Sequence, residues 1–156
     1  MTNMLKITKV TAVPIELVGT PSPAVVSEDS GSVWLAYHTH EPPEATAVLN
    51  FGGVFELRKG YPNDEGFHPY SGRGLGCYGL FVVEDSPRIE QIVQEQLVDS
   101  RRREGWAKNY RYWIYRFKET TIEVIGLSLH VAHIDRISEC PLEAILSRIN
   151  SSRKGL

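Results

Sequence analysis

Residues 109–131 read NYRYWIYRFKETTIEVIGLSLHV, and this stretch decides the fold that the sequence predicts. Residues 109–117 are strongly aromatic, and aromatic side chains favour strands. Residues 118–120 then turn the chain, and residues 122–131 return as a long strand. We therefore expect an antiparallel hairpin whose side chains supply much of the core.

More strands are expected upstream of this hairpin. One or two short strands are expected within residues 5–18, and single strands at residues 33–38 and at residues 78–83. Apolar and polar residues alternate through residues 45–51 and again through residues 54–58. Because Gly52 and Gly53 separate these two runs, the pattern is typical of another hairpin.

Two helices complete the expected elements. Asp85 and Ser86 can cap a helix, and Pro87 suits its first position because its missing N–H costs nothing there. Apolar residues then recur at helical spacing, which predicts a helix over about 87–104. Residues 141–149 predict a short C-terminal helix, and residues 151–156 a frayed tail.

The order of these elements predicts the fold class. Strands grouped as hairpins, rather than alternating singly with helices, indicate an α+β fold. We expect a mainly antiparallel, strongly curved sheet with one packed helix at about 87–104 and the short C-terminal helix. The 156 residues, 42% of them hydrophobic and 23% charged, are expected to form a single domain, 1–156. Residues 19–31, with two prolines and several serines, predict a mobile loop.

Charge and cysteine content restrict the partners and the location. The net charge of −2 disfavours nucleic-acid binding, which needs a clustered basic surface. Cys77 and Cys140 lie far apart, unlike the cysteines of a disulfide-rich secreted domain. The sequence has neither the apolar length of a membrane span nor the apolar core of a signal peptide near its first residues. We therefore expect a cytoplasmic protein that binds neither nucleic acid nor membrane.

The glycine-dense loop at residues 60–78 contains the main candidate site. Asp64, Glu65 and His68 are the candidate catalytic residues, because general acid–base catalysis needs titratable groups within hydrogen-bond reach of one substrate. The candidate ligand-binding residues are Asn63, Tyr70, Arg73 and Tyr78. The loop thus predicts a pocket for a small polar molecule, with acid–base catalysis there. A structural alternative stays open, in which these side chains bond their own turn or pair with one another.

The loop also excludes a common cofactor motif and carries a distinctive string. The lysine and serine or threonine of a P-loop are missing after residues 72–76, so no cofactor is expected. The string is GYPNDE at 60–65, HP at 68–69, GL at 74–75, Tyr78, Glu84 and Ser86, with Phe117, Thr120 or Thr121, and Glu123 further on.

This string resembles the pattern of a family of small bacterial proteins without an assigned activity. The family pattern has glycine where this chain has Phe67, and an aromatic residue where this chain has Lys59. The resemblance implies that the loop acts as one unit, and it implies no particular reaction or ligand.

Two alternatives to this pocket remain open. The small, mildly acidic chain also suits a non-catalytic protein-binding module, of the immunity or regulatory kind. His38 and His40, which share a face if both lie on one strand, form with Glu44 a loose likeness to the first metal motif of cupins. The spacing departs from that motif, and the second cupin motif is not evident in the sequence.

Overall fold

The structure is a computed structural model that describes residues 5–16, 22–40, 45–60, 68–96, 105–136 and 140–155. Over these residues the chain forms nine strands and two helices. In chain order these are β1 (Lys6–Lys9), β2 (Ala24–Ser27), β3 (Val33–Thr39), β4 (Ala45–Gly52), β5 (Glu56–Gly60), β6 (Gly79–Glu84), α1 (Pro87–Gln96), β7 (Arg111–Arg116), β8 (Thr121–Gly126), β9 (Ser128–Arg136) and α2 (Pro141–Lys154).

The strands form two antiparallel sheets whose inner faces make one core. The five-stranded sheet has the order β1-β6-β7-β8-β5, and the four-stranded sheet has the order β2-β3-β4-β9. Alternating side chains of both sheets point into the space between them, as in a sandwich. Among the most buried members of this core are Leu35, Tyr37, Leu49 and Phe51 from one sheet, and Tyr115, Phe117, Ile122 and Val124 from the other side.

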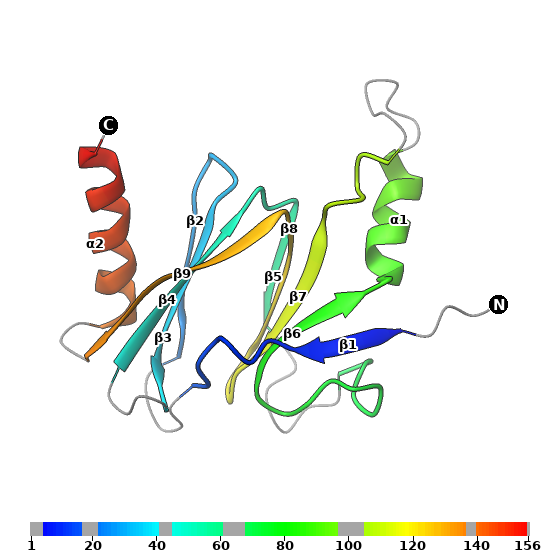
Figure 1. Cartoon of the computed structure of the whole chain (residues 1–156), viewed down its shortest axis with the longest axis horizontal. Coiled ribbons are helices and arrows are strands. Elements are labelled where there is room, and N and C mark those ends of the chain that lie inside the picture. The colour runs from blue at the N-terminus through cyan, green and yellow to red at the C-terminus, as the bar shows by residue number, and fades with distance from the viewer. Residues whose placement is uncertain are drawn as a thin grey trace.

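Each outer face of this pair of sheets carries one helix. Helix α2 places Ala144, Ile145 and Ile149 against the four-stranded sheet. Helix α1 places Ile92 against Phe81 and neighbouring side chains of the five-stranded sheet. Figure 1 shows the resulting order of layers: α2, the four-stranded sheet, the five-stranded sheet and α1. The expected α+β class with mainly antiparallel strands is confirmed.

A single, strongly curved sheet was the wrong expectation, and so was the hairpin around Gly52 and Gly53. Strand β4 pairs with β3 and β9, whereas β5 pairs with β8 in the other sheet. The two glycines therefore carry the chain from one sheet to the other. Gly53 has a φ of +58°, a backbone conformation that glycine adopts without the cost that a Cβ brings.

A second crossing between the sheets lies directly beside the first. The long strand expected at residues 122–131 divides at Leu127, so that β8 belongs to the five-stranded sheet and β9 to the other. The Leu127 N–H donates to the Gly52 carbonyl oxygen at 2.9 Å. A Cβ on Gly126 would come within 3.1 Å of the same oxygen. The hairpin of β7 and β8 itself is confirmed.

Two boundaries differ from the sequence prediction, and a third is tested only at its start. Strand β2 lies inside residues 19–31, because pairing with β3 satisfies its backbone despite the flanking turn residues. Helix α2 continues to Lys154 rather than ending at 149, and the serine hydroxyls of its last turns bond back to helix carbonyls. Helix α1 begins at Pro87 as expected, and residues 97–104 lie outside the described residues.

None of the described helices combines the length and the apolar character that crossing a membrane requires. The cytoplasmic location stays a prediction from the sequence.

Candidate functional site

A polar pocket of about 340 Å³ opens on the outer face of the five-stranded sheet. Strands β5, β7 and β8 supply its floor, the start of α1 supplies one wall, and the segment just before β6 supplies another. Its lining residues are Arg58, His68, Pro69, Tyr70, Pro87, Arg88, Gln91, Tyr112 and Glu123.

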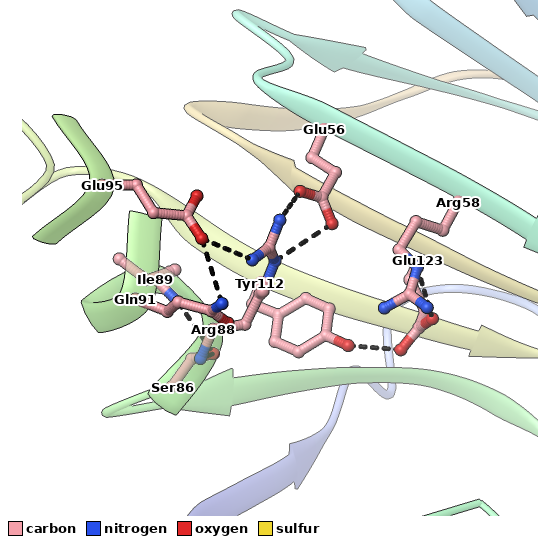
Figure 2. Close-up of polar contacts among 9 residues, drawn as sticks. All are labelled: Glu56, Arg58, Ser86, Arg88, Ile89, Gln91, Glu95, Tyr112 and Glu123. Carbon is pink, nitrogen blue, oxygen red and sulfur yellow. Dashed lines mark hydrogen bonds and ion pairs between the residues drawn. The ribbon is translucent and has the colours of Figure 1, made fainter. Parts of the chain in front are cut away.

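The carboxylate of Glu123 is the centre of this pocket. Glu123 lies on β8 opposite Ile114 of β7, and its side chain is only 13% exposed. Its Oε1 accepts a hydrogen bond from the Tyr112 hydroxyl and a second one from His68 Nε2 at 3.2 Å. Figure 2 shows the Tyr112 ring lying along the sheet with its hydroxyl pointing at this carboxylate. A partly buried carboxylate is thus held in one orientation by two donors.

His68 links the segment before β6 to this carboxylate. The residue is 4% exposed, and its Nδ1 accepts the backbone N–H of Tyr70 at 3.0 Å. Since Nδ1 accepts, Nε2 carries the proton and donates to Glu123. Both ring nitrogens are therefore engaged, and a catalytic role would require one of these two bonds to open.

The electrostatics of the site follow from these contacts. Burial alone would raise the pKa of Glu123, but the hydrogen bonds from His68 and Tyr112, together with the nearby charge of Arg58, bring the pKa below its ordinary value of 4.5. Burial, and then the hydrogen bond to Glu123, raise the pKa of Tyr112 above its ordinary value of 10.0. At neutral pH the site therefore holds an ionised carboxylate and a neutral phenol.

Two arginines flank the carboxylate, and they differ in their ion pairing and in their exposure to solvent. Arg88 donates from Nε to Glu56 Oε1 at 3.3 Å and from a terminal nitrogen to Glu56 Oε2, and it lies 3.8 Å from Glu95. Its charge is thus compensated, as Figure 2 shows. The side chain of Arg58 is 63% exposed, and its Nε lies 4.0 Å from Glu123 Oε2, beyond hydrogen-bond range.

Helix α1 fixes the wall of the pocket through its first residues. The Ser86 hydroxyl oxygen accepts the backbone N–H of Arg88 at 3.2 Å and that of Ile89 at 3.4 Å. This cap satisfies N–H groups that the first turn of a helix leaves without partners. The cap therefore sets the position from which Arg88 and Gln91 border the pocket.

The sequence prediction found part of this site. His68 and Tyr70 line the pocket, and their rings lie 5.3 Å apart. Arg73 and Tyr78 do not belong to the lining that the described residues form. Asn63, Asp64 and Glu65 lie outside the described residues, so the pairing of His68 with either carboxylate stays a prediction.

The site residues that sequence reasoning missed are Arg58, Arg88, Tyr112 and Glu123. One feature of the sequence could have indicated the site. Glu123 is a carboxylate on a strand face that otherwise carries apolar residues, Ile125 on the same strand and Ile114 across the hairpin. Glu123 also belongs to the downstream part of the string that resembles the bacterial family. The structure brings that part to 3.2 Å from His68 in the upstream part.

The two histidines of the metal alternative differ in their surroundings. His38 is buried on β3, and its Nδ1 lies 3.1 Å from the Thr46 hydroxyl. Burial lowers the pKa of His38 below its ordinary value. His40 is exposed in the turn after β3, and Glu44 lies outside the described residues. Among the residues that the structure describes, no three metal-binding side chains form a cluster.

Comparison of this chain with known protein families, with curated proteins and with solved structures gave no match. The function is therefore argued from the site itself.

The lowered pKa of Glu123 predicts a pH dependence of stability. As the pH falls below about 4.5, the unfolded chain takes up the proton first, so the contribution of Glu123 to stability is lost as the pH falls toward its lower folded-state pKa. Urea unfolding of the wild type and of Glu123→Gln across acidic pH measures this contribution. We expect the stability difference between the two proteins to shrink as the pH falls, and a constant difference would contradict the assignment.

Proposed function

We propose that this protein binds a small polar ligand in the pocket formed by β5, β8 and the start of α1. The observation that carries the proposal is the partly buried, ionised Glu123. Its Oε1 accepts from two donors, and among the described residues its Oε2 has only the 4.0 Å approach of Arg58. Enzymes and binding proteins fix polar groups in this way so that a ligand does not have to order them. The pocket volume of about 340 Å³ suits a small molecule.

The chemistry of the lining supports a ligand with both donor and acceptor groups. Glu123 Oε2 can accept from an ammonium, amide or hydroxyl group. Arg58 can donate to an anionic group or to a carbonyl oxygen through a guanidinium that is largely in solvent. Acid–base catalysis by His68 with Asp64 or Glu65 is the catalytic form of the same proposal. Binding is the primary role in our proposal, since His68 already uses both ring nitrogens.

A ligand screen tests the proposal. A compound that binds the folded protein raises its melting temperature by mass action, so thermal unfolding against a library of metabolites and divalent metals is the first experiment. We expect a stabilising polar compound whose affinity falls by about tenfold or more in Arg58→Gln and in Glu123→Gln. Lys59→Gln is the matched control, because Lys59 is the neighbouring exposed cation on β5, points away from the pocket and is expected to leave affinity unchanged.

Two results would count against the pocket. One is a screen in which no compound raises the melting temperature. The other is a hit whose affinity is the same in the wild type, Arg58→Gln and Glu123→Gln, because that compound would bind elsewhere.

Recognition of a protein partner is the second candidate function. Phe55, which is 36% exposed, lies in ring contact with Trp106 at 5.9 Å and with Tyr110 at 6.0 Å. Aromatic groups of this kind are enriched in protein interfaces. A purified partner whose affinity falls in Phe55→Ser, while the ligand screen stays empty, would favour this candidate over the pocket.

A further inference from the structure

The four-stranded sheet has one edge without charged residues. Strands at sheet edges usually carry charges that discourage pairing with another chain. Both edge strands of the five-stranded sheet have them: Lys6 and Lys9 in β1, and Glu56, Arg58 and Lys59 in β5. Strand β2 reads Ala-Val-Val-Ser, and no described strand pairs with its outer side.

The backbone of β2 has hydrogen-bonding groups directed outward. The Glu28 N–H donates to the Ser32 carbonyl oxygen of the hairpin with β3. Because bonding groups alternate along an antiparallel strand, residues 24 and 26 also face β3. The N–H and carbonyl groups of Val25 and Ser27 therefore point to the open edge.

Helix α2 adds exposed leucines along the same margin. Leu142 is 47% exposed and Leu146 is 46% exposed, and they lie one helical turn apart. A groove of about 620 Å³ separates α2 from β2 and its hairpin turn. Val26, Leu146 and Ile149 form the apolar part of its lining, and Glu28, Asp29 and Arg153 are among its polar residues. A strand edge that no described strand pairs and a groove of mixed character thus lie side by side.

We propose that a second copy of this chain binds to the outer edge of β2 and the adjacent groove beside α2. The two β2 strands pair in antiparallel orientation about a twofold axis. The two four-stranded sheets then become one continuous sheet, and the exposed leucines of each α2 are covered by the other copy. A twofold contact uses the same patch on both partners, so it closes at two copies and leaves neither β2 edge open.

The charges of α2 favour a second copy over an unrelated strand. The first turn of α2 carries Glu143, and its last turn carries Arg153 and Lys154. A twofold axis perpendicular to the joined sheet sets the two α2 helices antiparallel, so the acidic turn of each lies beside the basic turn of the other. The helix is therefore complementary in charge to its own copy.

Sedimentation equilibrium of the full chain tests the proposal. The wild type is expected at twice the chain mass of 17.6 kDa. Ser27→Pro removes only an outward N–H, and Leu146→Glu places a charge at the contact, so both variants are expected at the single-chain mass with their secondary structure intact. A wild type that stays at 17.6 kDa at every concentration overturns the proposal.

Leu127→Glu is the matched control. Leu127 is 47% exposed, as Leu142 is, and it lies at the crossing between β8 and β9, away from β2. This variant is expected to keep the dimer mass. Loss of the dimer in Leu127→Glu, with the dimer retained in Ser27→Pro and Leu146→Glu, would assign the contact to another surface and overturn the proposal.

A charge swap tests the antiparallel helices. Glu143→Lys and Lys154→Glu each put like charges beside one another and are expected to weaken the dimer by about fivefold. The double variant restores opposite charges and is expected to recover the wild-type affinity. A double variant as weak as the sum of the single variants would overturn the antiparallel arrangement.

Discussion

Phe51→Ala is expected to lower the free energy of unfolding by about 3–5 kcal/mol. Phe51 is 1% exposed, and its ring lies 5.4 Å from the ring of Trp113. Phe51 belongs to β4 and Trp113 to β7, so truncation opens a cavity between the two sheets. Urea denaturation followed by tryptophan fluorescence measures the loss.

Phe55→Ala is the matched control for this substitution. Phe55 is the same residue type in the link that follows β4, but it is 36% exposed. The expected loss is no more than about 2 kcal/mol, because the ring is partly in solvent and its truncation removes less buried surface than at Phe51. Equal losses for Phe51→Ala and Phe55→Ala would contradict a core formed between the two sheets.

Glu123→Leu is expected to remove ligand binding and to lower the free energy of unfolding by about 3 kcal/mol. The leucine leaves the buried Tyr112 hydroxyl and His68 Nε2–H without their acceptor. Glu123→Gln keeps an oxygen at that position, so we expect it to lose ligand affinity with a smaller loss of stability. Chemical denaturation and ligand titration of the two variants separate the two effects.

Glu84→Leu provides the comparison for Glu123→Leu. Glu84 lies on β6 in the same sheet, but its side chain is 49% exposed and pairs with Lys6 at 3.1 Å. Removing such a surface pair is expected to change stability by no more than about 0.5 kcal/mol. If Glu123→Leu were as mild as Glu84→Leu, the hydrogen bonds around Glu123 would not stabilise the fold.

The parts of the fold that sequence could predict are those set by local chemistry. The start of α1 follows from Ser86 and Pro87, and the hairpin of β7 and β8 follows from two strand patterns and a short turn. The assignment of strands to sheets is not local. Gly52 and Gly53 predict a change of chain direction both for a hairpin within one sheet and for a crossing to the other sheet. Only packing decides that β5 pairs with β8.

In the candidate site, too, local sequence could predict some residues and not others. His68 and Tyr70 were predictable because they belong to a polar, glycine-dense loop. Tyr112 and Glu123 lie in regular strands, where each has the ordinary place of a residue in an alternating pattern. The bond from His68 to Glu123 joins positions 55 residues apart, and no spacing rule indicates such a contact. The strand order β6-β7-β8 within the five-stranded sheet is what brings β8 under the segment before β6.

The two crossings between the sheets also determine the order in which the protein can assemble as it leaves the ribosome. Strand β4 is synthesised early, yet its neighbour β9 follows only after the chain has built the five-stranded sheet and returned through Leu127. Until then one side of β4, with its apolar ATAVLNF run, stays open in the nascent chain. An open apolar edge of this kind invites pairing between neighbouring chains. The interval between the synthesis of β4 and that of β9 is therefore the one in which this edge is open to such pairing.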